Sequence, residues 1–307
     1  MRLHFLASLL FVHVVNTLPL KVEWREEQER AQDEQFATVQ DMVGDATGDS
    51  LKIVGKRDSI TPLMTDCQFS IMMQITAVAE TSSTTGYGAC DTLDDGQGIS
   101  AGYIQFTSCH GSLQKVYKLY CDQKSNDLCT SDYESAISAA QGYGNCGSSN
   151  SGKNQAPGLD GFCDAWKKQA SDDADDFAKA QFLVAKAGYF DTIVDSVSKY
   201  HVTTALGIAQ MFDTAIQMGP GTVDTLADRT NQNVGNLEDG GVSEADWIKQ
   251  YVYERKLEQI NWGGAYVGTT ARLQPFEELV AANDLNFDHN DVTITLYGSS
   301  YTLVAKC

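Results

Sequence analysis

Apolar residues first recur at helical spacing shortly after residue 60. Four of them lie along one side of a helix: Cys67, Ile71, Ile75 and Val78. Thr61 is a suitable N-cap, and Pro62 suits the first position of a helix. The pattern therefore predicts a helix that begins near Thr61 and ends around Glu80.

The pattern changes after this helix to one of turns and short strands. Residues 81–98 are rich in Gly, Ser, Thr and Asp, and residues 99–106 alternate between apolar and small or polar side chains. We expect a small antiparallel sheet here. Residues 142–161 are rich in Gly, Ser and Asn, which predicts an irregular loop held by Cys146 and Cys163.

Helical periodicity dominates the rest of the chain. It predicts helices at about residues 172–187, 203–218, 243–261 and 270–282. Ser243 and Asp246 form a capping box, and the Gly219-Pro220-Gly221 turn ends the helix before it. Alternation at residues 292–296 and 300–304, around Gly298, predicts a closing hairpin.

The N-terminus has the pattern of a segment that is removed. A basic start precedes the apolar run Phe5–Val15, which is too short to span a bilayer. We therefore expect a signal peptide at residues 1–17. Residues 18–57 are acidic and end in Lys56-Arg57, which is typical of a pro-segment removed by a protease. A catalytic domain would then occupy residues 58–307.

An exported chain of this kind is expected to be secreted and extracellular. No later stretch is apolar for long enough to anchor the mature protein in a membrane. The 8 cysteines are an even number, which favours disulfide bonds, although the sequence leaves their pairing open. No CxxC pair or close His and Cys cluster occurs, so we expect no metal site.

Charge narrows the choice of partners. The chain has 41 Asp and Glu against 22 Lys and Arg, a formal net charge of −19. This balance argues against nucleic acid as a ligand and favours a cationic partner, with plain solubility of a secreted protein as the alternative.

Two carboxylates stand out as candidates for acid and base chemistry. Glu80 follows apolar residues at the end of the first predicted helix, where partial burial suits a general acid. Asp95 lies in a turn beside Gly96, where solvent suits a general base. By pattern alone, exposure at a helix end and an ordinary Asp-Gly turn explain the two residues better than catalysis does.

The order of the whole segment is more specific. Ala79-Glu-Thr-Ser-Ser-Thr, Tyr87-Gly and Asp94-Asp-Gly-Gln-Gly-Ile-Ser-Ala-Gly together resemble the active-site region of the family 46 chitosanases. The resemblance implies that Glu80 is the general acid, that Asp95 is the general base and that Ser100 positions the attacking water.

The resemblance extends from about Cys67 to about Leu303. It implies an ionic network that supports the acid, made by Asp213, Arg255 and Arg272. We also place three residues near the acid and base among the expected substrate contacts: Tyr87, Asp91 and Gln97.

The chain departs from the family pattern at three positions. Gln97 stands where Arg is usual, Ser100 where Thr is usual, and Ser112 where an acidic substrate contact is expected. A serine hydroxyl keeps the water-positioning chemistry. Two of these departures, Gln97 and Ser112, fall on expected contacts to individual sugars.

The resemblance implies a mainly α, two-lobed, lysozyme-like fold with a small antiparallel sheet beside the substrate cleft. The expected reaction is endo-hydrolysis of β-1,4 links between glucosamine units of chitosan, with inversion and without a cofactor. We expect a monomer. Two alternatives stay open: a lysozyme- or chitinase-like hydrolase of N-acetylated glycans, and a secreted carbohydrate-binding protein without catalysis.

Overall fold

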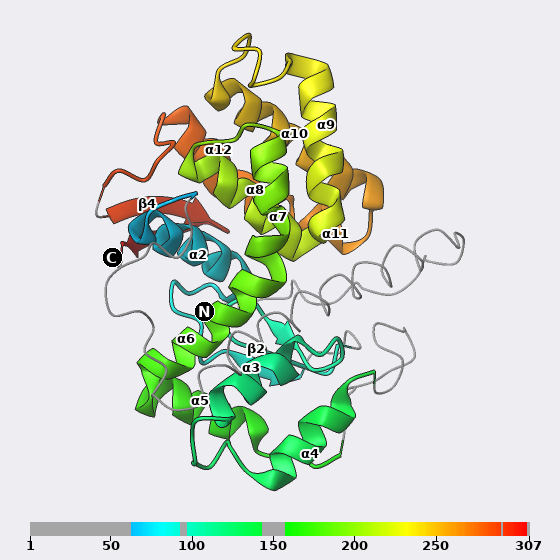
Figure 1. Cartoon of the computed structure of the whole chain (residues 1–307), viewed down its shortest axis with the longest axis vertical. Helices are drawn as coiled ribbons and strands as arrows, with labels where there is room; N and C mark the ends of the chain where they lie inside the picture. Colours follow the sequence, from blue (N-terminus) through cyan, green and yellow to red (C-terminus); the bar gives the residue numbers. More distant parts are fainter. Residues whose placement is uncertain (1–62, 93–96, 143–156, 290, 306–307) are drawn as a thin grey trace, which may run out of the picture.

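The computed structural model describes residues 63–92, 97–142, 157–289 and 291–305. This part of the chain is mainly α-helical and forms two lobes with small antiparallel sheets, as the sequence predicted (Figure 1). The expected signal peptide (1–17) and pro-segment (18–57) lie outside the described residues. Among the described residues, no helix is both long enough and apolar enough to span a membrane.

Helix α2 (Asp66–Thr81) carries Glu80 in its last turn. The predicted start near Thr61 is wrong, because Thr65 is the N-cap. Its hydroxyl accepts a hydrogen bond from the backbone of Gln68, and the Gln68 side chain accepts one from the Thr65 N–H. This reciprocal pair satisfies two amide groups that the helix itself cannot, which fixes the start.

The smaller lobe contains a three-stranded antiparallel sheet in the order β1 (Cys90–Thr92), β2 (Ile99–Ala101) and β3 (Phe106–Thr107). Its helices are α3 (Ser112–Cys121), α4 (Ser131–Ala140) and α5 (Phe162–Asp172), none of which was predicted from the sequence. A disulfide bond between Cys90 and Cys163 joins β1 to α5. The expected loop at 142–161 lies largely outside the described residues, and Cys163, one of its two expected anchors, is bonded to Cys90.

A helical connection runs between the lobes (Figure 1). It consists of α6 (Ala174–Ala185), the π-helical turn η1 (Lys186–Phe190) and α7 (Asp191–Lys199). The predicted helix at 172–187 is thus part of a longer element. The Lys186 ammonium and the Asp191 carboxylate pair across the wide turn at 2.6 Å. A π-turn accommodates one extra residue in a helix, and such turns are frequent at functional sites.

The larger lobe holds most of the remaining helices: α8 (Ala205–Met218), α9 (Pro220–Val234), α10 (Glu244–Trp262), α11 (Ala265–Gly268), η2 (Thr270–Leu273) and α12 (Gln274–Ala281). The helices predicted at 203–218 and 243–261 are confirmed. Ser243 caps α10 as expected, accepting from the Asp246 N–H at 3.1 Å. Helix α9 was not predicted. Pro220 belongs to the predicted stop signal of α8 and also begins this next helix.

The closing hairpin is confirmed as β4 (Asp291–Leu296) and β5 (Ser299–Val304), paired from Asp291 with Val304 to Leu296 with Ser299. It lies alongside α2 (Figure 1). The Gln74 side chain fixes this position, because its amide donates to the Val304 carbonyl at 2.8 Å and its oxygen accepts from the Val304 N–H at 3.1 Å.

The expected disulfide bonds are present in the described part of the chain. Besides the bond that joins β1 to α5, Cys121 is bonded to Cys129, and Cys67 and Cys109 are also disulfide-bonded. A continuous apolar core runs through both lobes, and among its largest fully buried side chains are Trp166, Phe177, Phe212 and Trp247. The elements that carry the candidate site are therefore held by packing as well as by covalent bonds.

Candidate active site

Glu80 lies at an unfavourable place for a negative charge. Its side chain is 20% exposed, and the helix closes two residues later, where Ser82 donates its N–H to the Val78 carbonyl. The C-terminal end of a helix carries a partial negative charge, which disfavours a carboxylate there. Arg272 compensates for it, because its Nη1 donates a hydrogen bond to Glu80 Oε1.

Arg272 also holds Asp213, a fully buried residue of α8. Arg272 Nε donates to Asp213 Oδ2 at 2.8 Å, and Nη2 donates to Oδ1 at 2.7 Å. Arg255 from α10 adds a bond to Oδ2 at 2.8 Å, and the Thr76 hydroxyl donates to Oδ1 at 3.0 Å. The structure thus brings together Asp213, Arg255, Arg272 and Glu80, the grouping that the resemblance implied.

These four side chains form a set of two carboxyl groups and two guanidinium groups. Burial alone would raise the pKa of Asp213, but the Arg272 and Arg255 guanidiniums outweigh it and hold this pKa well below its usual range. Burial lowers the pKa of Arg272, yet Asp213 and Glu80 overcome that effect and raise it. Buried charges are stable only when paired and hydrogen-bonded, so each member depends on the others.

A chain of side-chain amides continues the network away from Glu80. Gln217 Oε1 accepts from Arg255 Nη2 and from Gln259 Nε2, both at 2.6 Å. Its amide nitrogen donates to the Thr269 hydroxyl at 2.9 Å. Thr269 directly precedes η2, the turn that carries Arg272. The contacts therefore link α8, α10 and the segment that presents Arg272 to Glu80.

Two tyrosines lie within the electrostatic reach of Glu80. Tyr189 belongs to the π-turn between the lobes, and burial followed by the Glu80 charge raises its pKa to about 12. It therefore stays neutral at physiological pH. Tyr297 lies in the turn between β4 and β5, and the charges of Arg272, Glu80 and Asp213 all act on it. Neither residue was predicted to belong to the site.

The three-stranded sheet carries the other predicted residues. Ser100 in β2 is buried and pairs with Asp91 of β1 and Thr107 of β3. Asp91 is exposed, and its carboxylate accepts from the Thr92 N–H at 2.8 Å. Gln97 lies two residues before the start of β2, and its carbonyl accepts from the Cys109 N–H at 3.1 Å. Asp95, the predicted base, lies outside the described residues.

Tyr87 and Ser112 have clear structural roles. The Tyr87 carbonyl accepts from the Trp166 indole at 2.8 Å and from the Gln181 amide at 3.0 Å, and its ring packs against Tyr103 with centroids 5.3 Å apart. The Ser112 hydroxyl accepts from the Thr107 N–H at 2.9 Å at the start of α3. The predicted contact between Tyr87 and substrate stays a prediction.

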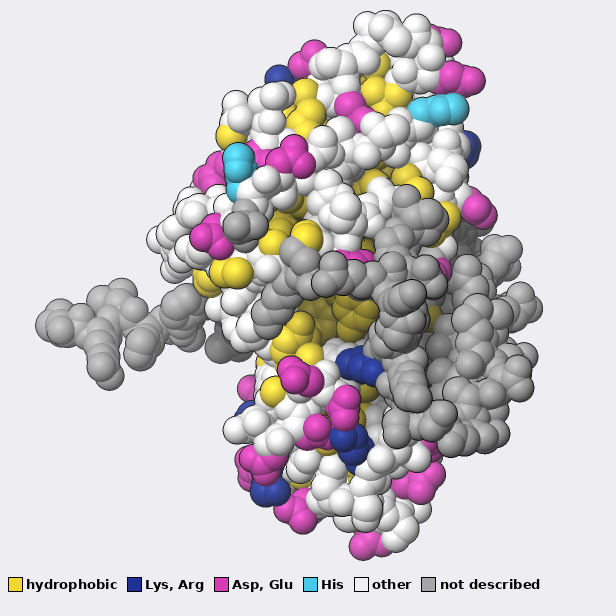
Figure 2. Space-filling model, turned by 60° about the vertical axis from the view of Figure 1, so that its left-hand side comes forward, with side chains coloured by type: hydrophobic (Ala, Val, Ile, Leu, Met, Phe, Trp, Pro, Cys, Tyr) yellow, Lys and Arg dark blue, Asp and Glu magenta, His cyan; other side chains and the backbone are white. Residues whose placement is uncertain are grey.

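Tyr87 also lines a cavity of about 190 Å³ beside α2. Its walls are mostly apolar, with Met73 and Ala77 from α2 and Phe182 from α6. On the molecular surface, hydrophobic side chains gather in a hollow at mid-height, and Asp and Glu side chains are spread above and below it (Figure 2). The acidic composition of the chain is thus visible on both lobes.

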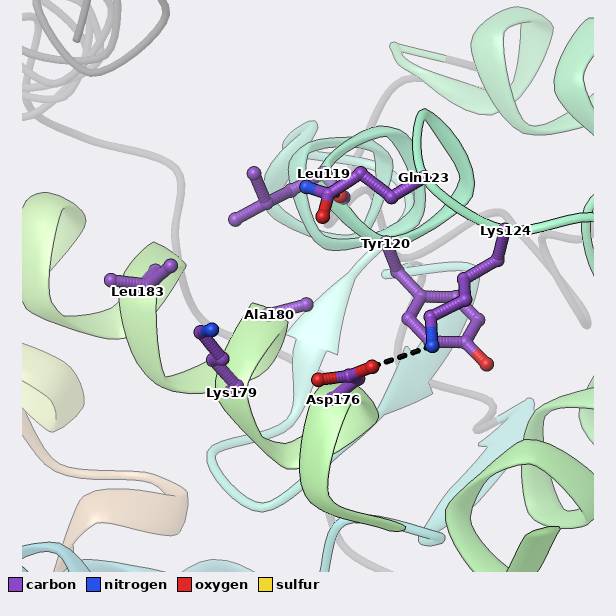
Figure 3. A pocket seen from close by; sticks show the side chains of 8 residues that line it. All are labelled: Leu119, Tyr120, Gln123, Lys124, Asp176, Lys179, Ala180 and Leu183. Atoms are coloured by element: carbon purple, nitrogen blue, oxygen red, sulfur yellow. Dashed lines mark hydrogen bonds and ion pairs between the residues drawn. The ribbon is translucent and has the colours of Figure 1, made fainter. Parts of the chain in front are cut away.

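A second pocket lies between α3 and α6 and contains none of the predicted site residues (Figure 3). Lys124 reaches across it to the carboxylates of Asp176 at 2.5 Å and Asp173 at 2.8 Å. Because Lys124 is already paired with two carboxylates, this pocket offers no chemistry comparable to that around Glu80. Among the described residues, no group of three or more His, Cys, Asp or Glu is placed to hold a metal ion.

Comparison with known proteins shows the family of the chain. Residues 74–270 match glycosyl hydrolase family 46. The chain is similar to a chitosanase of Bacillus subtilis, with 28% identity over 193 residues, which is 61% of this chain and 66% of that protein. The match thus spans just under two thirds of the relative's length.

Solved structures show the same lysozyme-like fold. The native chitosanase of Bacillus subtilis MY002 has a TM-score of 0.64 at 24% identity, covering 78% of this chain and 99% of that one. The family 46 chitosanase of Gynuella sunshinyii in complex with chitotetraose has a TM-score of 0.63 at 23% identity, covering 79% and 100%. The family match includes Glu80, Asp213 and Arg255, and the fold is shared over nearly the whole length of these enzymes. The chain therefore belongs to glycosyl hydrolase family 46 and is a glycoside hydrolase.

Proposed function

We propose that this protein is a chitosanase that cleaves β-1,4 links between glucosamine units within chitosan chains. The main support is that Glu80, a partly exposed carboxyl group, pairs with Arg272. Arg272 in turn pairs with the buried Asp213, which also pairs with Arg255. The family and the names of the similar proteins support this substrate. The net charge of −19 suits a polymer that carries protonated amines.

Glu80 acts as the general acid. Arg272 binds its Oε1, which leaves Oε2 to carry the proton toward the oxygen of the scissile link. As the link breaks, that proton moves to the departing oxygen and Glu80 becomes a carboxylate. The hydrogen bond from the Arg272 guanidinium then joins two opposite charges and strengthens. Because Asp213 already balances Arg272, the guanidinium keeps a partner whether Glu80 is protonated or ionised.

Asp95 acts as the general base, and Ser100 positions the water. Asp95 takes a proton from the water while the water oxygen bonds to the anomeric carbon from the side opposite to the departing oxygen. Inversion of configuration follows, so a β-link yields an α-anomer. In support, Ser100 lies in the strand that begins just after the Asp95 segment, and its neighbour Asp91 is exposed for contact with a substrate amine. Gln97 and Tyr87 are the further proposed contacts.

We further propose that the protein is secreted, without its first 57 residues, and acts as a monomer without a cofactor. The disulfide bonds Cys90–Cys163 and Cys121–Cys129 support export, because such bonds persist in oxidising compartments. N-terminal sequencing of the secreted protein tests the processing step, and a mature protein that begins well before Asp58 contradicts it.

The decisive experiment measures new reducing ends from chitosan with the wild-type protein, Glu80→Gln and a matched control, Glu258→Gln. Glu258 is also mostly buried, at 14% exposed, and also pairs with an arginine, Arg229, at 2.5 Å. We expect Glu80→Gln to lose at least about 10³-fold in kcat while Glu258→Gln retains activity. A Glu80→Gln protein that still depolymerises chitosan contradicts the role of Glu80.

Two further measurements separate the proposal from its alternatives. Substrates of graded acetylation distinguish a chitosanase from a hydrolase of N-acetylated glycans. Activity that rises with acetylation favours a lysozyme- or chitinase-like hydrolase. Wild-type protein that binds these polymers without shortening them favours a non-catalytic binding protein. Proton NMR of the first product tests inversion, and an initial β-anomer refutes it.

A further inference from the structure

The turn of the closing hairpin has an unusual residue at its tip. Leu296 pairs with Ser299, so Tyr297 and Gly298 form a two-residue turn, and both have positive φ, 51° and 77°. Turns with two positive φ values favour Asn-Gly or Asp-Gly, because a residue with a bulky Cβ is strained in this conformation. Tyrosine is thus a costly choice at this position.

Burial accounts for only part of the tyrosine. The residue is 49% exposed, among the highest values for large hydrophobic residues in the described part of the chain. One side of the ring packs against the protein and the rest faces solvent, whereas an asparagine would form the same turn with less strain. A strained backbone that presents a half-exposed ring points to a functional constraint.

The hairpin carries Tyr297 toward Glu80. Gln74 of α2 binds the far end of β5 at Val304, and β4 and β5 both contact α2. The strands therefore extend from Gln74 toward the helix end where Glu80 lies (Figure 1). The electrostatics agree: burial raises the pKa of Tyr297, the Arg272 guanidinium opposes the rise, and the charges of Glu80 and Asp213 add to it.

We propose that Tyr297 contacts the substrate, with its ring against the sugar bound beside Glu80. An exposed aromatic face offers apolar contact to the C–H face of a sugar and a cation–π contact to a protonated amine. This role rests on the proposed chitosanase function. It explains why a strained and half-exposed tyrosine stands where the turn favours asparagine.

The test compares Tyr297→Asn and Tyr297→Phe with the wild type on a glucosamine hexamer. Tyr297→Asn relieves the strain and removes the ring, so we expect the melting temperature to rise by about 2–4 °C and KM to rise about fivefold. Tyr297→Phe keeps the ring and should keep a KM within about twofold of the wild type. A purely structural tyrosine would instead lower the melting temperature when replaced.

Tyr253→Asn is the matched control, because Tyr253 is similarly exposed at 53% but lies within the helix α10. We expect no change in its KM. Wild-type protein that does not cleave the hexamer refutes the proposed function. Normal wild-type cleavage with an unchanged KM in Tyr297→Asn overturns this inference alone, as does a Tyr297→Phe variant as impaired as Tyr297→Asn.

Discussion

Arg272 holds both oxygens of the Asp213 carboxylate through separate nitrogens, Nε at 2.8 Å and Nη2 at 2.7 Å, in the fully buried interior of the larger lobe. Such two-point binding fixes the plane of the guanidinium and hence the direction of its third nitrogen. That nitrogen, Nη1, is the one that binds Glu80. The orientation of the candidate acid is therefore set by Asp213, which lies 133 positions further along the chain.

Asp213→Asn should destabilise the protein strongly. It leaves the buried Arg255 and Arg272 without their counter-ion, and breaking a buried pair costs about 3–5 kcal/mol. We expect the melting temperature to fall by about 10 °C, with loss of kcat. Asp224→Asn is the control, because Asp224 pairs with Lys199 at the surface and should change stability by less than about 1 kcal/mol. Equal losses in the two variants would contradict the network.

Arg272→Lys should reduce kcat far more than it changes KM. A lysine keeps the positive charge but cannot bind both oxygens of Asp213 and still reach Glu80. The loss therefore falls on the orientation of the acid rather than on substrate binding. Arg229→Lys, which alters the Arg229–Glu258 pair, serves as the control. Steady-state kinetics on soluble chitosan oligomers decide the question, and a kcat equal to that of the control argues against the role of Arg272.

Stability should fall in acid because of Asp213. Its pKa is lowered in the folded protein, so this carboxylate contributes stability that is fully present above the unfolded pKa of about 3.9. The contribution is lost as pH falls from there toward the lower folded pKa. Thermal unfolding from pH 6 to pH 2.5 should show a steeper decline below about pH 4 for the wild type than for Asp213→Asn. Parallel curves would contradict this assignment.

The disulfide bonds Cys90–Cys163 and Cys121–Cys129 should differ in their effects. Cys90–Cys163 spans 73 residues and Cys121–Cys129 spans 8, so the chain-entropy model assigns about 4 and about 2.5 kcal/mol to them. Replacing both cysteines of each pair with serine tests this by thermal unfolding. The longer bond also anchors β1, which pairs with the strand of Ser100, so its loss should reduce activity as well. A larger fall in melting temperature and activity on replacing Cys121 and Cys129 would contradict both expectations.

The Michaelis constant for chitosan should depend strongly on salt. A net charge of −19 attracts a polycation, and added salt screens charges that lie more than a Debye length apart. We expect KM to rise between low salt and about 0.5 M NaCl, where screening is nearly complete, while kcat changes little. A KM that is the same at both salt concentrations argues against electrostatic attraction of the substrate.

Local signals in the sequence were sufficient for several elements. Strict alternation predicted β4 and β5, and the Ser243 cap with its Asp246 partner predicted α10. The start of α2 was missed because Thr61-Pro62 and Thr65-Gln68 are both plausible starts, and only the folded chain selects Thr65. Helix α9 was missed because its buried positions are few (Val223, Leu226, Ala227 and Thr230), so its apolar stripe is faint in the sequence.

The candidate site could not be predicted from periodicity. Glu80 and Arg272 are 192 residues apart, and no local pattern joins them. Their grouping followed from the family resemblance. Thr76, Gln217 and Gln259 were missed because single polar residues within a helical pattern look like surface positions until the fold buries them. Tyr297 was missed because its positive φ follows from the hairpin register, which alternation in the sequence does not fix.

The π-turn at Lys186–Phe190 gives the connection between the lobes one residue more than a regular α-helix would have there. Because this turn already takes up one extra residue, removing one residue from it would let the connection continue as regular helix without rotating α7. Removing one residue from α6 would instead rotate everything downstream by about 100°, since each residue of an α-helix turns by that angle, and would direct Ile193 and Val197, now fully buried, away from the core. A single-residue deletion should therefore be tolerated within the π-turn and harmful within the helix before it, so that this turn is where the spacing between the lobes can change at least cost.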